Sequence, residues 1–179
     1  MKPPGSDHAE FVICDHTIDI TYVRLAHEFA YLAILLDVFT RSIRGWEVGA
    51  YLDSQLALRP LQRALQVAWP EIHHSDQGVQ YAASGYVMQL QACGVQISMA
   101  RAGQPRENAY AERVIRTIKE EEVYLNGYQD LREARANLAA FIDEVYQHKR
   151  IHSALGYLTP AEFEAQWRGQ NGDSGGRRA

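Results

Sequence analysis

The chain opens with apolar runs whose length and composition are typical of strands. Residues 11–25, 29–39 and 42–52 are rich in β-branched, aromatic and other apolar residues, and short polar connections separate them. Runs of this kind predict three neighbouring antiparallel strands in a meander.

After residue 53, helical periodicity alternates with short apolar runs. Ser54 is the expected N-cap of the first helix, and Gly94 is expected to close the second. Because a crossover helix lets the next strand join a sheet in parallel, the pattern predicts an α/β fold with a mixed five-stranded sheet flanked by helices. The predicted elements are helices at 54–68 and 82–92 and strands at 71–74 and 95–99.

The rest of the sequence predicts helices and a loop. A loop is expected at 101–107, a helix from Asn108 to about residue 124, a longer helix opened by Asp130 to about residue 149, and a last one from Pro160. The expected division is an extension at 1–10, one core at 11–168 and a disordered tail at 169–179.

Composition narrows the class of protein. No apolar stretch approaches the roughly 20 residues that cross a bilayer, and the first ten residues lack a signal-peptide core, so no membrane partner and a cytoplasmic location are expected. Cys14 and Cys93 are too few for a four-cysteine zinc site, and we expect both to be buried apolar residues.

Three acids carry the candidate chemistry. Asp19 falls within the first predicted strand, Asp76 follows the fourth, and Glu112 lies on a predicted helix. The fold would have to gather them. Carboxylate oxygens are the hard ligands that Mg²⁺ prefers, so three converging acids indicate a site for two divalent ions.

Several motifs in fixed order accompany these acids, and together they resemble the catalytic core shared by DDE transposases of bacterial insertion sequences and retroviral integrases. The resemblance spans residues 11–167, is close to the insertion-sequence branch, and implies a ribonuclease H-like fold. The motifs are Asp19-Ile20-Thr21-Tyr22, Leu36-Asp37-Val38-Phe39-Thr40-Arg41 with Gly45-Trp46, His74-Ser75-Asp76-Gln77-Gly78-Val79-Gln80-Tyr81, Ser98-Met99 with Gly103, Asn108-Ala109-Tyr110-Ala111-Glu112, and Leu155-Gly156-Tyr157-Leu158-Thr159-Pro160.

The resemblance implies an enzyme that cleaves and transfers DNA strands with a divalent metal. Asp19 and Asp76 would hold one Mg²⁺ or Mn²⁺ ion, and Asp19 and Glu112 would hold a second. A water would attack a phosphodiester at a transposon end, and the released 3′-hydroxyl would then attack target DNA. We expect His74 and Asn108 to lie just behind the metal ligands.

Positive charge is concentrated around Glu112. The whole chain carries a net charge of -4, yet residues 101–119 hold five Lys or Arg against two Glu. The resemblance suggests that Lys119 contacts DNA near the reacting phosphate, and we expect Arg113 and Arg116 to contact phosphates as well. Two alternatives need no contact with DNA. The charges could form an ordinary solvated helix face, or Glu112 could pair with Arg116, which would stabilise the helix by only about 0.3–0.5 kcal/mol.

Other acids and histidines of the chain are weaker candidates for the site. Asp15 shares the strand face of Asp19 but lacks its motif, and Asp37 is expected to cap a turn. His148 and His152 lack the glutamate of a zinc motif, and His73 is expected to be a hydrogen-bonded structural group. The chain departs from the family's usual residues at His16, Glu107, Gln147 and Ile151.

Two other functions stay open. A related ribonuclease H-like nuclease would hydrolyse DNA without strand transfer, and a catalytically silent interaction module would pair with a full transposase. The expected partners are transposon-end and target DNA and further copies of the chain on that DNA. Because the first strand is predicted from Phe11, the family's usual helix-turn-helix recognition region is expected in an upstream domain or protein.

Overall fold

The computed structural model describes residues 15–99 and 109–171, and its centre is one five-stranded sheet. The strand order is β3-β2-β1-β4-β5, with β1–β3 antiparallel and β4 and β5 added in parallel to β1. The predicted mixed sheet is therefore confirmed. The strands are β1 (Asp15–Arg24), β2 (Phe29–Asp37), β3 (Ile43–Gly49), β4 (Ile72–Ser75) and β5 (Gln96–Met99).

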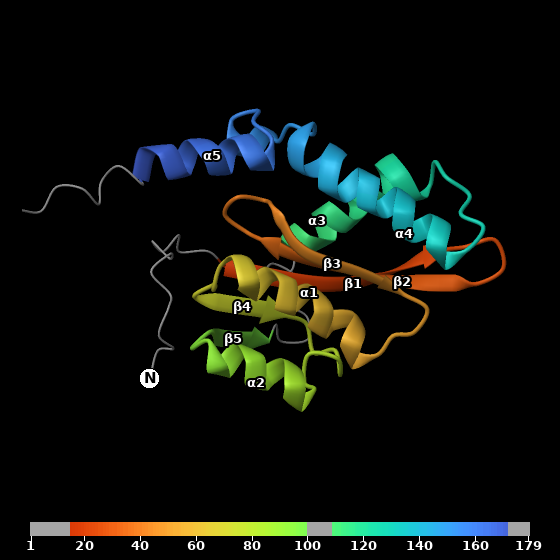
Figure 1. Ribbon diagram of the computed structural model, residues 1–179, viewed down its shortest axis with the longest axis horizontal. Coiled ribbons are helices and arrows are strands. Elements are labelled where there is room, and N and C mark those ends of the chain that lie inside the picture. Colours follow the sequence, from red (N-terminus) through yellow and green to blue (C-terminus); the bar gives the residue numbers. More distant parts are fainter. Residues whose placement is uncertain (1–14, 100–108, 172–179) are drawn as a thin grey trace, which may run out of the picture.

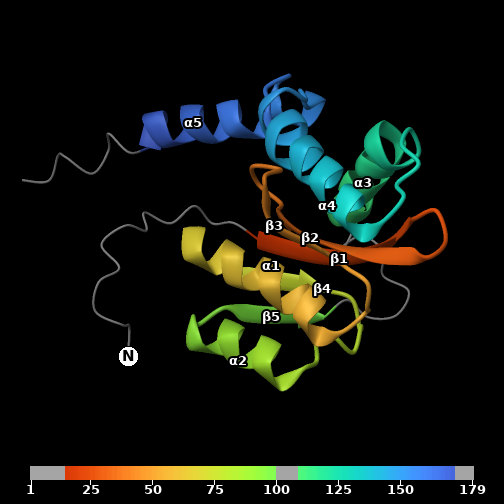
Figure 2. The same ribbon diagram turned by 45° about the vertical axis from the view of Figure 1, so that its right-hand side comes forward.

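Helices cover both faces of this sheet (Figures 1 and 2). α1 and α2 lie on one side, whereas α3 and α4 lie on the other. The helices are α1 (Ser54–Val67), α2 (Ser84–Ala92), α3 (Ala109–Ile118), the π-helix η1 (Lys119–Val123), α4 (Leu131–Ala139), the π-helix η2 (Ala140–Tyr146), the 3₁₀ turn η3 (Ser153–Leu155) and α5 (Pro160–Asn171).

The two helix layers create two hydrophobic cores, one on each face of β2. Leu35 packs into the core that contains Leu61 of α1. Its neighbour Ile34 packs into the core that contains Ile118 of α3 and Leu138 of α4. Successive side chains of a strand point to opposite faces, so a strand covered on both sides is apolar at nearly every position. This explains the unbroken apolar run of β2.

Two helix details differ from the sequence prediction. Asp53, and not Ser54, caps α1, because its carboxylate accepts the backbone N–H of Leu56 at 3.0 Å. The helix that was predicted from residue 108 to 124 is α-helical only to Ile118 and then continues as η1. A π turn bonds residue i to i+5, which brings buried Val123 over buried Ile118 and leaves Glu120 and Glu121 exposed.

The helix predicted at 130–149 changes in the same way. Asp130 caps it as expected, by accepting the N–H of Glu133 at 2.8 Å, but the α-helix ends at Ala139 and η2 follows. α5 extends to Asn171, three residues into the predicted tail. The predicted loop at 101–107 and the residues before Asp15 lie outside the described ranges. Within those ranges, no helix has the length and apolar character needed to cross a membrane.

Candidate active site

Asp19 lies in the middle of β1, partly buried beneath helix α3. Its Oδ1 accepts the backbone N–H of Ile20 at 2.8 Å. The pKa of Asp19 is nevertheless raised to about 6, first because burial disfavours the charged form, and further because the carboxylates of Asp76 and Glu112 repel it. Three acids from separate elements therefore share one electrostatic environment.

Asp76 directly follows β4, the parallel neighbour of β1. The register pairs Thr17 with His74, so two more residues along both chains place Asp76 opposite Asp19. Asp76 Oδ1 accepts the N–H of Gly78 at 2.8 Å. A Cβ at Gly78 would lie 2.9 Å from that same oxygen, so glycine permits the tight turn that fixes the carboxylate.

Tyr81 gives independent evidence for this placement. Its ring is buried, and burial is the main reason why its pKa is raised. The charges of Asp76 and Asp19 raise the pKa further. Both carboxylates therefore lie near the same phenol.

Glu112 occupies the first turn of α3 and is exposed. The opposite face of this helix is buried through Ala111, Val114 and Ile118. No ion pair joins Glu112 to Arg116 in the described part of the chain. The alternative of a simple surface pair is therefore not seen.

The donor chemistry of the three acids suits a hard divalent cation, since it consists of carboxylate oxygens without sulfur or imidazole. The described residues nevertheless contain no group of three His, Cys, Asp or Glu side chains close enough to hold a metal ion. The three carboxylates repel one another, so we expect them to stay apart when no cation is bound. A bound cation would relieve this repulsion.

The other predicted site residues have mixed positions. His74 Nε2 contacts Asp15 Oδ2 at 3.7 Å, so the contact found for His74 is with the competing acid of β1. Asn108 lies outside the described residues. The Lys119 ammonium lies 4.5 Å from the centre of the Tyr22 ring, and its charge lowers the pKa of Asp19. Lys119 therefore lies near Asp19, and its contact with DNA stays a prediction.

Arg113 and Arg116 are exposed on α3. Among the residues the structure describes, neither of them nor Lys119 has a carboxylate within 4.0 Å. By contrast, Arg150 is paired with Glu121, and Arg135 with Glu47. The cations of α3 are thus left available for an external anion.

The competing residues have structural roles. Asp37 is buried, accepts the N–H groups of Phe39 and Thr40, and pairs with Arg44 at 2.8 Å, so it caps the β2–β3 turn as predicted. His73 Nε2 bonds the Tyr86 hydroxyl at 2.8 Å, which confirms its structural role.

Sequence reasoning gave Tyr22 no role beyond membership of the first motif. The structure leaves this aromatic ring exposed beside Lys119, three positions after Asp19 on β1. An aromatic residue in the same motif as Asp19 is the signal that could have identified it.

Comparison with known proteins places these features in context. Two models of the integrase core domain match residues 16–105 and 93–160. The chain is 35% identical over 149 residues to the transposase for insertion sequence element IS904 of Lactococcus lactis, covering 82% of this chain and 59% of that protein. It is 33% identical over 151 residues to transposase InsF of insertion sequence IS3fB of Escherichia coli, covering 83% and 52%.

The fold is similar to that of the HTLV-2 integrase catalytic core solved with magnesium. The TM-score is 0.62 at 12% identity, and the match covers 87% of this chain and 99% of the other. This similarity confirms the predicted ribonuclease H-like fold. The chain spans between one half and three fifths of the length of the two transposases.

Proposed function

This chain belongs to the integrase core domain family, and we propose that it is the catalytic core of an insertion-sequence transposase, which cleaves DNA strands and transfers them to target DNA. The observation that carries the proposal is the raised pKa of Asp19, to which Asp76 and Glu112 both contribute. An acid whose charged form is opposed first by burial and then by two neighbouring carboxylates is typical of functional sites. The similarity to two transposases supports the same function.

The proposed cofactor is a pair of Mg²⁺ or Mn²⁺ ions. Asp19 would serve both ions, Asp76 the first and Glu112 the second. When bound, such a pair activates the attacking oxygen and steadies the leaving oxygen of an in-line phosphoryl transfer. The magnesium in the HTLV-2 integrase core supports this choice of metal.

The chain's own residues prepare this chemistry in separate ways. Asp19 is mostly ionised above its pKa of about 6, so it can act as a ligand near neutral pH. The N–H of Gly78 orients Asp76. Lys119 offers a charge next to Asp19 that can hold a DNA phosphate. None of these residues has to act as a covalent nucleophile.

The partners proposed for the site are transposon-end DNA, target DNA and further copies of the chain on that DNA. The free cations of α3 support contact with phosphates. The fold is also similar to a chain of the simian T-cell lymphotropic virus intasome, at a TM-score of 0.67. A helix-turn-helix domain or protein would supply sequence recognition.

The test replaces each acid by its amide. Asp19→Asn, Asp76→Asn and Glu112→Gln should each lower metal-dependent DNA nicking and strand transfer by about 100-fold or more, because shape is kept while the charge that holds the ions is removed. The measurement is product analysis on labelled DNA with Mg²⁺ or Mn²⁺. Asp15→Asn is the matched control on the same strand and should stay active.

The products also decide between functions. Joined strands support a transposase, whereas cleavage without joining supports a nuclease. Undiminished strand transfer by the Glu112→Gln protein, with contaminating nuclease excluded, contradicts the role of Glu112.

A further inference from the structure

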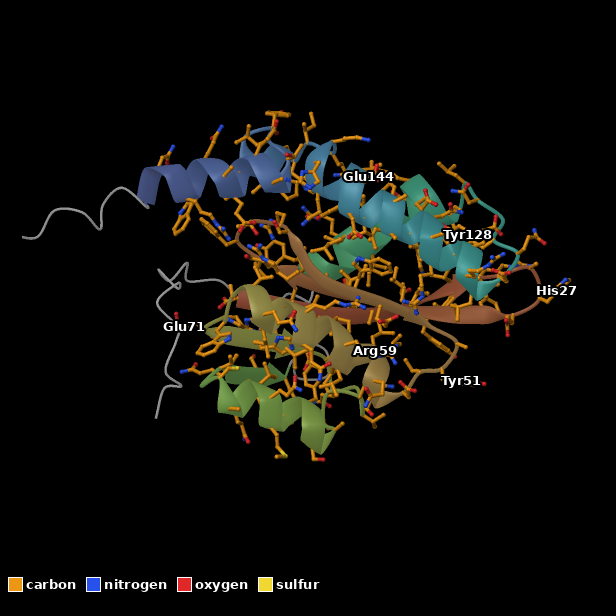
Figure 3. All side chains as sticks on the ribbon, viewed as in Figure 1. His27, Tyr51, Arg59, Glu71, Tyr128 and Glu144 are labelled. Carbon is orange, nitrogen blue, oxygen red and sulfur yellow. The ribbon has the colours of Figure 1, made fainter. Side chains whose placement is uncertain are left out.

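A groove of about 630 Å³ lies at the end of the molecule where the β1–β2 hairpin approaches the segment between η1 and α4. Figure 3 labels His27 at the tip of that hairpin and Tyr128 on the neighbouring segment. Its volume falls within the roughly 300–1,000 Å³ typical of small-molecule sites. The residues that matter for its chemistry are Tyr22, Arg24, Phe29, Lys119 and Tyr124.

Three aromatic rings of this groove are open to solvent. Tyr22, Phe29 and Tyr124 are 60%, 54% and 69% exposed. Tyr22 and Phe29 pack edge to face with ring centres 5.7 Å apart, which leaves ring surface available to a ligand. Aromatic side chains left on a surface in a group favour a binding function, and unpaired bases stack on such platforms.

The charge of the groove is positive. Arg24 and Lys119 line it, and none of the Asp or Glu residues in the described ranges does. Neither cation has a carboxylate within 4.0 Å among the described residues. The nearby Glu122 is engaged by the Tyr128 hydroxyl at 2.9 Å and the Asn126 amide at 3.0 Å. Aromatic rings between two free cations suit a base with its phosphate.

Lys119 joins this groove to the acids. Its ammonium lies over the Tyr22 ring at 4.5 Å, and its charge also acts on Asp19. Tyr22 follows Asp19 by three residues on β1. Lys119 is therefore the residue that a DNA strand would pass between the acids and the groove.

We propose that this groove binds one unpaired nucleotide of the DNA strand next to the reacting phosphate. Its base stacks on Tyr22, Phe29 and Tyr124, and its phosphate is held by Lys119 and Arg24. The inference rests on the proposed function, since it takes DNA as the substrate of the three acids. A groove of this kind would favour DNA with a frayed or overhanging end over a blunt duplex.

The test uses a short duplex with a single-stranded 5′ overhang that carries 2-aminopurine, whose fluorescence falls when the base stacks. The full chain should quench the overhang, and a blunt duplex should bind more weakly. Tyr124→Ser and Phe29→Ser should each weaken binding of the overhang about tenfold, which is about 1.4 kcal/mol and within the range for one stacked base. Tyr51→Ser is the matched control.

Tyr51 suits this purpose because it is 78% exposed and does not line the groove. Equal effects of the Tyr51 and Tyr124 variants, or absent quenching, overturn the inference. If the groove variants instead abolish self-association and leave quenching intact, the groove is an interface between copies, and the inference is also wrong.

The same experiment separates the two proposals. Asp19→Asn removes the acid needed for cleavage and leaves the groove aromatics in place, so this protein should still quench the overhang. Quenching without any metal-dependent cleavage by the wild-type chain would overturn the proposed function alone. Cleavage without quenching would overturn the groove alone.

Discussion

The ionised Asp19 carboxylate lowers the free energy of unfolding of the metal-free protein. Its folded-state pKa is about 6, against a usual value of 3.8. The raised pKa means that its stabilising contribution is present below about pH 3.8 and is lost as pH rises through about 6. Above that pH the folded protein holds a charge that burial and two neighbouring acids oppose.

Asp19→Asn should therefore stabilise the metal-free protein near neutral pH. The free energy of unfolding should rise by up to about 3 kcal/mol, and the gain should vanish at about pH 4. Urea unfolding with a chelator at both pH values measures it. Asp15→Asn, on the same strand, serves as the control and should show no comparable pH-dependent gain. A gain of the same size at both pH values would contradict the electrostatic explanation.

Buried histidines have the opposite dependence on pH. Burial lowers the pKa of His16 to about 4 and that of His73 to about 3, so both stay neutral in the folded protein. Unfolding lets each histidine bind a proton below about pH 6.5, so stability falls as pH falls from there toward the folded-state pKa values.

Each of these histidines should contribute a slope of about 1.4 kcal/mol per pH unit between about pH 6 and pH 5. His73→Gln should flatten the stability curve by that amount, because glutamine can keep a hydrogen bond to Tyr86 without titrating. The measurement is denaturant unfolding across this range. His27→Gln, at the exposed hairpin tip, should leave the slope unchanged, and an equal effect there would contradict the prediction.

Close packing of α1 on β3 depends on Gly45. A Cβ there would lie 2.2 Å from the Pro60 carbonyl oxygen and 2.8 Å from its carbonyl carbon. Backbone atoms cannot move aside as a flexible side chain can, so a methyl group would push the helix off the sheet. This contact explains the glycine of the Gly45-Trp46 motif.

Gly45→Ala should lower the free energy of unfolding by about 3 kcal/mol or more, since overpacking against rigid backbone is costly. Thermal or urea unfolding measures the loss. Gly85→Ala is the matched control, because nothing lies within 4 Å of its added Cβ. It sits in α2, where alanine is favoured over glycine, so it should be neutral or slightly stabilising. A neutral Gly45→Ala protein would show that the approach of α1 is not essential.

At the level of elements, strand and helix positions could be predicted because apolar periodicity reports burial directly. β2 is the clearest case, since both of its faces are covered. The π-helical segments could not be predicted, because they depend on which side chains pack on the sheet. Val123, for example, is buried in the same core as Ile118, five residues before it. The cap of α1 was assigned to Ser54 instead of Asp53 because these two adjacent residues both have side chains able to cap a helix.

The candidate site was predictable to a similar degree. Motif context identified Asp19, Asp76 and Glu112, and the structure gives them a shared electrostatic environment. Their closure around metal stays a prediction, because carboxylate positions depend on a bound cation as well as on the chain. The contact of His74 with Asp15 depends on parallel pairing of β1 and β4, which fixes side-chain neighbours that sequence spacing does not report.

The whole molecule has a negative net charge with a positive region on and around α3. The net charge is -4, yet Arg113, Arg116 and Lys119 have no carboxylate partners within the described residues. Such a distribution favours contact with a polyanion along one face only. Phosphate contacts carry no direct sequence information, so this chain should bind DNA weakly and with little sequence preference.

Lys119→Ala should weaken binding equally for transposon-end and random duplexes, and should reduce the slope of log affinity against log salt by about 1. Filter binding at two salt concentrations measures this. Lys149→Ala is the matched control, because Lys149 is exposed and lies near Glu144 at 4.0 Å. A strong, salt-insensitive preference for one end sequence would contradict the prediction.

One helix carries both Glu112 and Lys119, two turns apart, with its apolar face packed in the core between them and the sheet. Because α3 and η1 form one continuous helix, the position of Glu112 constrains the position of Lys119. If metal draws Glu112 toward Asp19, it also sets the orientation in which Lys119 meets a phosphate. Thermodynamic reciprocity then requires that DNA tighten metal binding by the same factor as metal tightens DNA binding. A copy of the chain without DNA would then bind metal more weakly than a copy on DNA.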